Sequence, residues 1–435
     1  MHDPSGDPRR RTPRTDAVLE DPRLAGVRER LGRARVKTAV TGTLRACREG
    51  LVAPEDVVPV VLSSLPSTAT SMRAVLNATG VLVHTNLGRA PLSASAVEAL
   101  IVAAGATDVE LDLATGTRAR RGAAPLAALA AAVPEAAGVH VVNNGAAALA
   151  LVTCALATGR EVVVARGELV EIGDGFRIPE LLESVGATVR EVGTTNRVRL
   201  EDYAKALGPR TGFVLKVHPS NFRVEGFTSV VPVRELATLD VPVVADIGSG
   251  LLAPHPRLPD EPDAATTLRD GAALVTASGD KLLGGPQSGL LLGERELVER
   301  LRRHPLARAL RVDKLTLAAL EATLAGPVPP VAAALAADPA VLARRAATMA
   351  AELGAPAEAV PSEAAVGGGG APGVVLPSAA VALPAALAAP LRVGEPPVVG
   401  HVREGRLLLD LLAVPAERDA DVVAAVRAAL AGLEA

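Results

Sequence analysis

Short apolar runs recur through the middle of the chain, and polar or glycine-rich residues separate them. Seven runs have the length and composition of buried β-strands, at residues 139–144, 161–166, 188–192, 213–218, 241–246, 272–278 and 289–292. Strand and helix patterns alternate from about residue 75 to 320. This alternation favours a sheet covered by helices, so the sequence predicts an α/β fold with a mostly parallel, seven-stranded sheet.

The two ends of the chain follow other patterns. Residues 1–18 are rich in Pro, Arg, Asp and Gly, which predicts disorder. Past residue 320 the chain is rich in Ala and Pro. The segment 366–371, which contains a glycine run at 367–370, predicts a flexible loop, and two short strands are expected before an amphipathic helix from about Glu417. In the segment 22–62, apolar side chains roughly follow helical spacing: Leu24, Val27, Leu31, Val36, Ala39 and Val40. We therefore expect four parts: a disordered 1–18, a helical 19–65, an α/β domain 66–325 and a small α+β domain 326–435.

Charge is distributed unevenly. The whole chain has a formal net charge of −3, whereas residues 1–50 hold twelve Arg and Lys against seven Asp and Glu, a local balance of +5. Phosphate contacts dominate nucleic-acid affinity, so a basic module of this kind suits tRNA binding. The alternative is a basic helix that is merely solvated.

Composition narrows the class of protein further. A chain of 435 residues with 49% apolar residues has enough material for more than one core. Cys47 and Cys154 are the two cysteines and lie far apart, which supports neither a disulfide framework nor a zinc site. Pro, Gly or charged residues interrupt the apolar stretches, and no secretory leader is apparent, so we expect a cytoplasmic protein with no membrane partner.

Lys281 stands alone in a glycine-bounded turn between the sixth and seventh runs. A lysine at the mouth of a sheet can lose its proton and attack a carbonyl. Asp246 ends the fifth run, at the carboxyl edge where open parallel sheets bind ligands. A Schiff-base amine and a carboxylate facing a pyridine nitrogen are the two groups that pyridoxal phosphate requires. The alternatives are a solvated lysine and an aspartate that caps a helix.

A phosphate cradle is the third requirement of that cofactor. The polar turn at 143–146 follows a strand and opens an alanine-rich helix, whose unpaired backbone N–H groups can bind phosphate. After the fourth run, Asn221 is a candidate to reach the cofactor's phenolic oxygen and His218 to lie over its ring. An ordinary hydrogen-bonded histidine is the alternative for His218.

Several blocks of sequence, in the same order along the chain, resemble one known family. They look like bacterial selenocysteine synthase, the L-seryl-tRNA(Sec) selenium transferase, and the resemblance is strong over roughly residues 70–325. It implies a fold type I pyridoxal-phosphate-dependent transferase of the aspartate aminotransferase kind. The blocks are 77–90, 165–173, 176–179, 191–197, 278–287 and 304–314.

The resemblance also implies the roles of individual residues. Lys281 and Asp246 are the expected catalytic residues. Cofactor binding is expected from Lys281, Asp246, Asn143, Asn144, Gly145, Ala146, His218, Asn221 and Ser278. Guanidinium groups match tetrahedral oxyanions, and the arginines expected to hold the selenium donor are Arg89, Arg118, Arg121, Arg308 and Arg311. No metal site is expected.

The chain departs from the family pattern at three positions among or beside these expected site residues. Ala119 replaces a glycine, Arg120 a histidine or serine, and Gly145 follows Asn144 where the family has a third consecutive asparagine. These changes bear on donor specificity, although an added arginine does not repel an anion.

The reaction implied by the resemblance converts L-seryl-tRNA(Sec) to L-selenocysteinyl-tRNA(Sec). Pyridoxal-phosphate-dependent β-elimination of water, with Lys281 as the base, gives an aminoacrylyl-tRNA, and selenium from selenophosphate then adds to it. The resemblance further implies a dimer-based homo-oligomer, such as a decameric ring.

Two other functions remain open on the sequence. One is a pyridoxal-phosphate-dependent ammonia lyase or β-eliminase acting on a small amino sugar phosphate or amino acid, which would need no tRNA-binding module. The other is a catalytically inactive tRNA-binding protein, against which the intact Asp246 and Lys281 argue.

Overall fold

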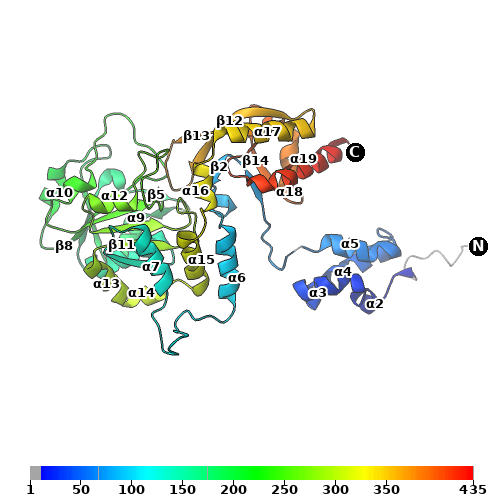
Figure 1. Ribbon diagram of the computed structural model, residues 1–435, viewed down its shortest axis with the longest axis horizontal. Coiled ribbons are helices and arrows are strands. Elements are labelled where there is room, and N and C mark those ends of the chain that lie inside the picture. The colour runs from blue at the N-terminus through cyan, green and yellow to red at the C-terminus, as the bar shows by residue number, and fades with distance from the viewer. Residues whose placement is uncertain (1–10, 67, 174, 435) are drawn as a thin grey trace, which may run out of the picture. The chain divides into compact units, whose positions relative to one another are not determined.

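The computed structural model describes residues 11–66, 68–173 and 175–434, and the chain divides into two compact units (Figure 1). We call residues 1–74 the helical unit and residues 75–435 the larger unit, and each is described by itself. Residues 1–10 of the predicted disordered segment lie outside the described residues.

The helical unit is held together by one small core. Its helices are α2 (Thr15–Leu19), α3 (Ala25–Leu31), α4 (Arg33–Arg48) and α5 (Val57–Ser64), with 3-10 turns η1 (Pro22–Leu24) and η2 (Pro54–Asp56). Leu24, Val36 and Val40, predicted from their spacing, are fully buried in this core. Val18 and Leu19 of α2 join them, so the prediction of disorder up to residue 18 is wrong at this short helix.

A seven-stranded sheet forms the centre of the larger unit, as predicted. Its strand order is β3-β11-β10-β9-β8-β4-β7, and β11 alone runs antiparallel to its neighbours β10 and β3. The strands are β3 (Gly138–Val142), β4 (Glu161–Ala165), β7 (Thr188–Val192), β8 (Thr211–Val217), β9 (Val243–Gly248), β10 (Leu274–Ser278) and β11 (Gly289–Gly293). The carboxyl ends of the six parallel strands therefore meet at one edge.

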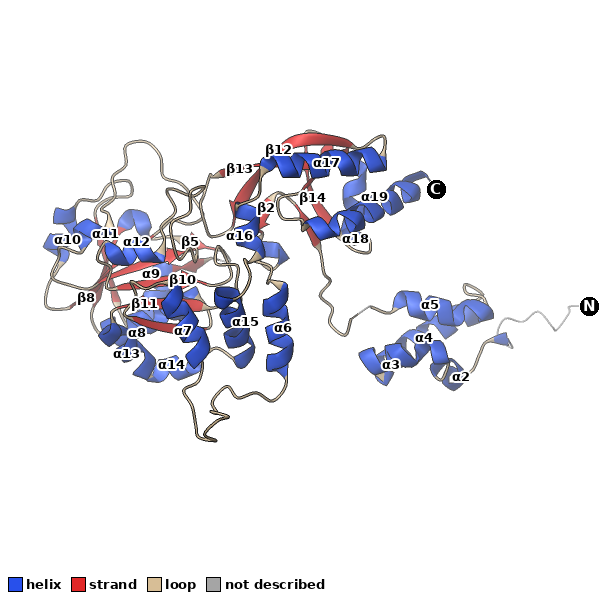
Figure 2. Cartoon of the chain, in the orientation of Figure 1, coloured by secondary structure: helices blue, strands red, loops and turns tan. Residues whose placement is uncertain are grey.

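Helices cover both faces of this sheet (Figure 2). One face packs against α8 (Gly145–Ala157), α9 (Ile178–Ser184), α13 (Arg295–Arg303) and α14 (Pro305–Ala309). The other packs against α7 (Ala123–Ala132), α10 (Leu200–Ala206), α11 (Val233–Leu236), α12 (Ala264–Arg269) and α15 (Lys314–Ala325). Sheet residues alternate between the two cores, as the pleat of a strand requires: Val244 belongs to the first and Ala245 to the second.

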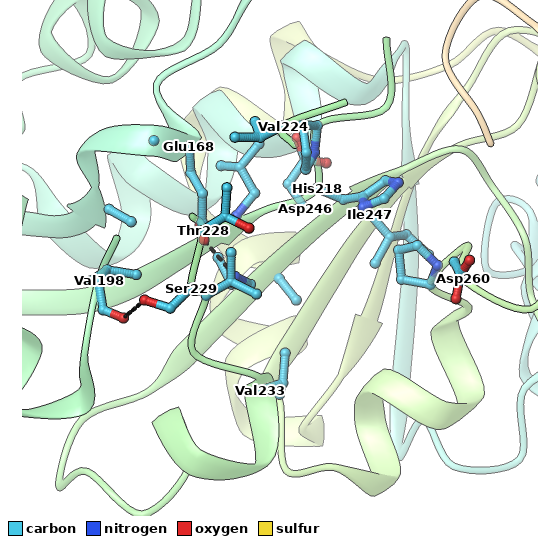
Figure 3. A pocket seen from close by; sticks show the side chains of 18 of the residues that line it. Glu168, Val198, His218, Val224, Thr228, Ser229, Val233, Asp246, Ile247 and Asp260 are labelled. Atoms are coloured by element: carbon cyan, nitrogen blue, oxygen red, sulfur yellow. Dashed lines mark hydrogen bonds and ion pairs between the residues drawn. The ribbon is translucent and has the colours of Figure 1, made fainter. Parts of the chain in front are cut away.

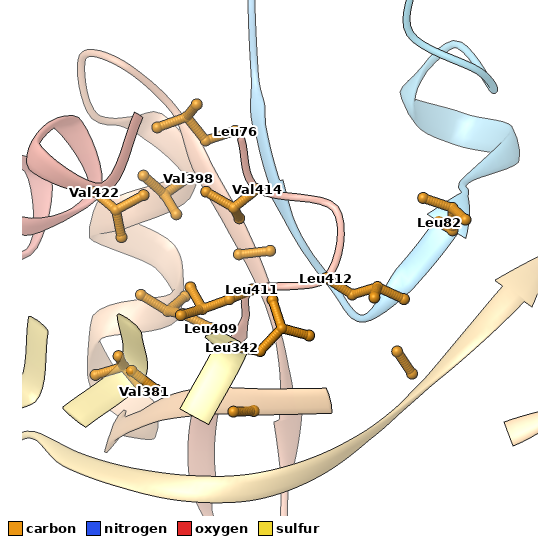
Figure 4. Close-up of a cluster of buried hydrophobic side chains, with 14 of the residues drawn as sticks. Leu76, Leu82, Leu342, Val381, Val398, Leu409, Leu411, Leu412, Val414 and Val422 are labelled. Atoms are coloured by element: carbon orange, nitrogen blue, oxygen red, sulfur yellow. The ribbon is translucent and has the colours of Figure 1, made fainter. Parts of the chain in front are cut away.

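A second sheet has six strands in the order β1-β14-β15-β13-β12-β2. They are β1 (Leu76–Ala78), β2 (Val81–Val83), β12 (Glu358–Gly367), β13 (Val375–Pro384), β14 (Val398–Arg403) and β15 (Arg406–Asp410). Helices α16 (Pro330–Leu335), α17 (Pro339–Leu353), α18 (Ala388–Val393) and α19 (Asp419–Glu434) accompany it. Figure 4 shows part of their shared core, where Leu76 and Leu82 lie with residues such as Val398 and Leu409. Strands from residues 76–83 thus complete a sheet made otherwise of residues beyond 357, which the predicted division at residue 325 did not anticipate.

The remaining described elements are one helix of eleven residues and several short elements. They are helix α6 (Ala94–Ala104), the β5 (Glu171–Ile172) and β6 (Phe176–Arg177) hairpin, and the 3-10 turns η3 (Thr85–Leu87), η4 (Arg166–Glu168), η5 (Ala385–Leu387) and η6 (Ala416–Arg418).

One apolar stretch, Lys314–Leu335, is long and apolar enough to span a membrane by length and composition. The prediction that Pro, Gly or charged residues interrupt every apolar stretch before it could span a membrane was therefore too strict. The stretch contains two helices, α15 and α16, and Leu317 and Leu320 of α15 are buried against the large sheet. A core helix passes the same test of length and composition, so the stretch is weak evidence for a membrane span.

Candidate active site

Lys281 lies in a tight turn directly after β10. The turn is fixed by its backbone: Gly284 N–H donates to the Lys281 carbonyl (3.0 Å), Gly285 N–H to Gly279 (2.9 Å), and Leu282 N–H to Ser249 after β9 (2.9 Å). Burial lowers the pKa of the Lys281 amine, and the charge of Arg89 lowers it further, while Asp246 opposes both. A lysine amine with a lowered pKa is neutral more of the time and is therefore a better nucleophile.

Asp246 lies on β9, beside Thr276 of β10 in the register of the two strands. Thr276 Oγ1 donates to Asp246 Oδ1 (2.8 Å). Burial raises the pKa of the Asp246 carboxyl, and the Thr276 hydrogen bond and the Lys281 charge partly offset this rise. A buried carboxylate of this kind is stabilised by a nearby positive charge, which the protonated nitrogen of a pyridine ring would provide.

The turn between β3 and α8 brings Gly145 against Ser278 at the end of β10. A methyl group at Gly145 would lie 2.8 Å from Ser278 Oγ, so the close approach of these two strand ends depends on this glycine. The side chain of Asn144 caps α8 by accepting from Ala147 N–H (2.8 Å). This cap does not use the N–H groups of Gly145 and Ala146 at the start of the helix, which can therefore bind an anion. The side-chain amide of Asn143 lies instead against the carbonyls of Leu310 and Arg311.

His218 follows β8 and is held at two points. Its backbone N–H donates to the Asp246 carbonyl (3.0 Å), and its ring Nε2 lies 3.1 Å from Oε2 of Glu261. Asn221, in contrast, is exposed, and its amide donates to the carbonyl of Glu171 (3.4 Å). The structure therefore places His218 beside Asp246, and gives Asn221 no hydrogen bond to the other predicted residues.

The five predicted arginines fall into two places. Arg89, with a left-handed backbone (φ 65°), pairs with Asp280 beside the lysine (2.7 Å). The other four line a cavity of about 530 Å³ together with Arg120, Arg302, Arg303 and two histidines: Arg118, Arg121, Arg308 and Arg311. Glu110 supplies negative charge to this group, at 3.2 Å from Arg118, 3.5 Å from Arg121 and 3.8 Å from Arg311.

His140 forms part of the wall of this arginine-lined cavity. Burial lowers the pKa of His140 to about 4, and the charges of Arg302 and Arg120 act in the same direction. The ring is therefore neutral at neutral pH, and the positive charge of the cavity comes from its arginines.

A second cavity of about 570 Å³ begins at Asp246 and His218 and extends past Glu168 and Ser229 (Figure 3). Glu168 forms a buried ion pair with Lys216 and accepts from Val217 N–H (2.9 Å). Sequence reasoning missed Glu261 and Asp280, which contact the predicted residues His218 and Arg89, and Glu168, which lines the cavity beside Asp246. Each lies in a loop or turn whose local pattern does not distinguish a buried acid from an exposed one.

Comparisons with known proteins find relatives over almost the whole chain. The family model described as L-seryl-tRNA selenium transferase matches residues 75–415, and that of the selenocysteine synthase N-terminal region matches residues 9–48. The L-seryl-tRNA(Sec) selenium transferase of Hyphomonas neptunium is 40% identical over 439 residues, covering 92% of this chain and 94% of its own. The L-seryl-tRNA(Sec) selenium transferase of Geobacter metallireducens is 41% identical over 460 residues, covering 97% of this chain and 99% of its own.

A solved structure confirms the predicted fold class. D-glucosaminate-6-phosphate ammonia-lyase aligns with a TM-score of 0.59 over 82% of this chain and 96% of its own. Sequence identity is 19%, so the likeness concerns the fold alone.

Proposed function

The chain belongs to the L-seryl-tRNA selenium transferase family, and from this membership we propose that it converts L-seryl-tRNA(Sec) to L-selenocysteinyl-tRNA(Sec), with pyridoxal phosphate as cofactor and selenophosphate as selenium donor. The observation that carries the chemical part of the proposal is the placement of Asp246 on β9 and of Lys281 in the turn that follows the neighbouring strand β10. The buried amine of Lys281 and the buried carboxylate of Asp246 influence each other's pKa at the carboxyl edge of the sheet.

Pyridoxal phosphate fits the residues that are present. The N–H groups of α8 at Gly145 and Ala146, together with the Ser278 hydroxyl, are suited to the phosphate, and Asp246 to the pyridine nitrogen. When bound, the cofactor supplies an electron sink for charge that develops at the Cα of the seryl group.

The protein's own residues would then move protons and bind the donor. Lys281 Nζ is the base that takes the Cα proton, because burial keeps its amine neutral more of the time than a lysine in water. Arg308, Arg311 and the loop at 118–121 bind the selenophosphate anion, since their guanidinium groups converge on one cavity. Arg89 is already paired with Asp280, so we assign it to holding the lysine turn as well as to anion binding.

We assign tRNA binding to residues 19–65. Helix α4 contains five basic residues and no acidic one in its sixteen positions, and its basic side chains are exposed: Arg33, Arg35, Lys37, Arg45 and Arg48. A row of exposed cations suits a polyphosphate backbone.

We further propose that the enzyme is a cytoplasmic homo-oligomer built from dimers, such as a decameric ring. The proposal rests on the family resemblance; large exposed apolar side chains are residues that a subunit contact could bury. Among them are Ile101 and Val102 of α6, Leu113, Phe227 and Val230.

The test is a reconstitution assay with the purified chain, pyridoxal phosphate, seryl-tRNA(Sec) and isotopically labelled selenophosphate. We expect label to appear in the aminoacyl group of the tRNA, and Lys281→Ala to abolish it. Turnover of a small amino sugar phosphate or amino acid, with no labelling of tRNA, would instead support the ammonia-lyase alternative. A chain that binds tRNA but neither binds the cofactor nor labels the tRNA would be the inactive binding protein.

A further inference from the structure

Glu261 is a buried acid in the connection between β9 and α12, and the reaction proposed above does not use it. Its side chain is 1% exposed. Buried Leu258, whose carbonyl accepts from Glu261 N–H (3.2 Å), and Pro262 flank it in the turn, and Asp263 then caps α12. These anchors direct the carboxylate inward. A buried carboxylate is costly unless several hydrogen bonds satisfy it, so its contacts indicate what it does.

One oxygen of Glu261 joins two parts of the larger unit. Oε2 lies 3.1 Å from Nε2 of His218 and accepts from the backbone N–H of Ala371 (2.6 Å). Oε1 is buried with no hydrogen-bond partner among the described residues. If this acid served packing alone, an apolar side chain would fill the same space at lower cost.

Ala371 ends the glycine run at 367–370, which lies against Lys281. A methyl group at Gly369 would lie 2.6 Å from both Cε and Nζ of the lysine. The conformation of the run is one that few residues adopt, with φ of 101° at Gly367, 97° at Gly369 and 46° at Ala371. Backbone of this kind persists only where surrounding contacts hold it, and the Glu261 carboxylate provides one such contact at its end.

The second contact of Glu261 decides how His218 can act. A carboxylate only accepts hydrogen bonds, so Nε2 of His218 must carry the proton that points to Glu261. This hydrogen bond restricts the orientation of the ring beside Asp246.

We propose that Glu261 is a positioning residue of the active site, which fixes His218 in one orientation and pins the glycine run over Lys281. The proposal rests on Lys281 being the cofactor lysine, as proposed above. Both hydrogen bonds end on Oε2 of Glu261. The position of the glycine run over Lys281 and the orientation of His218 therefore depend on each other.

The experiment compares Glu261→Gln with Asp260→Asn, a neighbouring acid that is exposed in the same turn. Hydrogen exchange of peptides covering residues 366–373, measured by mass spectrometry without cofactor, should become about tenfold faster or more in Glu261→Gln, since a charge-assisted hydrogen bond to the Ala371 N–H is weakened. The Asp260→Asn protein should exchange as the wild type does.

Kinetics provide the second readout. In Glu261→Gln, borohydride should still attach the cofactor to Lys281, kcat should fall by about tenfold or more, and KM for seryl-tRNA should change by less than about twofold. Wild-type exchange and wild-type kcat in this variant would overturn the proposal. If borohydride failed to attach the cofactor to Lys281 in the wild type, the proposed function would be at fault, whereas the exchange result would still stand alone.

A variant that retains the charge covers the case in which Glu261→Gln does not fold. Glu261→Asp withdraws the carboxylate by one methylene and should accelerate exchange of residues 366–373 by a smaller factor than Glu261→Gln. Exchange equal to that of the wild type in Glu261→Asp would also contradict the proposal.

Discussion

The basic residues of helix α4 in the helical unit and Lys281 in the larger unit have opposite surroundings. On α4, side chains such as Lys37 and Arg48 are exposed, and the helix contributes no acid to neutralise them. In the larger unit, Lys281 lies under the backbone of Gly369, and burial lowers its pKa. Exposure preserves a positive charge, as binding of a polyanion requires, whereas burial favours the neutral form of an amine, as a nucleophile requires.

The arginine-lined cavity combines the two conditions. Arg118 is largely exposed, while Arg121 is only 21% exposed and donates to the Val312 carbonyl (3.0 Å). An arginine keeps its charge in either setting, which a lysine does not, so a partly enclosed site for a small oxyanion is better built from arginine.

The largest effect should come from removing the buried amine. Lys281→Ala should reduce turnover by about 1,000-fold or more and abolish borohydride attachment of the cofactor, because Lys281 is the amine whose charge acts on the Asp246 carboxyl. The measurement is single-turnover labelling of tRNA together with peptide mapping of the reduced protein. Lys205→Ala, at an exposed lysine of α10, is the matched control and should behave as the wild type.

Two other lysines would receive the cofactor if this assignment is wrong. Lys216 is held by Glu168 in a buried ion pair, and Lys314 donates to the carbonyl of Gly105. Mapping of the reduced cofactor to either of them would contradict the role of Lys281.

Deleting residues 1–65 should have the next largest effect. It should weaken the binding of tRNA and leave the binding of the cofactor unchanged. Affinity for seryl-tRNA should fall by about 100-fold or more at moderate salt, because the exposed positive charge of α4 is lost. The visible spectrum of the bound cofactor should not change, since Lys281 and Asp246 belong to the larger unit. Filter binding over a range of salt concentrations measures the affinity for tRNA, and absorbance measures the cofactor spectrum. Unchanged affinity would move tRNA recognition to the larger unit.

A smaller effect is expected from two exposed cations on α4. Lys37 and Arg48 are eleven residues apart, close to three turns, and so lie on one side of the helix. Lys37→Ala with Arg48→Ala should weaken tRNA binding by about tenfold and reduce the slope of log affinity against log salt by about 2. Arg23→Ala is the control, because the Arg23 guanidinium is already bonded to Asp21 (2.9 Å). An effect of equal size in the control would show that net charge, and not position, determines affinity.

The smallest effect concerns the pH at which the cofactor attaches. Only the neutral amine of Lys281 reacts, so the attachment rate rises with pH through the pKa of that amine. The Asp246 charge raises the pKa of Lys281 and the Arg89 charge lowers it. Asp246→Asn should therefore move the midpoint of the rate profile to lower pH, and Arg89→Ala to higher pH. Stopped-flow absorbance measures both, and shifts in the same direction would refute this electrostatic account.

Sequence alone predicted the large sheet well because its strands are apolar and bounded by clear turns. All seven strands were expected close to where they lie, and residues that follow different strands, such as Gly145 and Ser278, are brought together at the carboxyl edge of the sheet. The ten-residue strands β12 and β13 were missed, because alanine, proline and serine give them little strand propensity.

The supporting residues of the site were not predictable for a different reason. Glu261 and Asp280 act through contacts with residues far away in the chain, Ala371 and Arg89 respectively. No local pattern encodes such a contact. The predicted flexible loop at 367–370 illustrates the same limit, because its glycines allow a close approach to Lys281 that only the folded chain reveals.

The six-stranded sheet also has a consequence for the order in which the chain can fold during synthesis. Leu76 of β1 pairs with Val398 of β14, and Val81 of β2 pairs with Ala365 of β12. Strands made early therefore wait for partners that leave the ribosome more than 280 residues later, and their edges stay open meanwhile. The glycine run over Lys281 arrives in the same late segment. A nascent chain stopped short of residue 365 would hold the lysine turn but lack the glycine run that lies against Lys281, so the active site is completed only after this late segment is made.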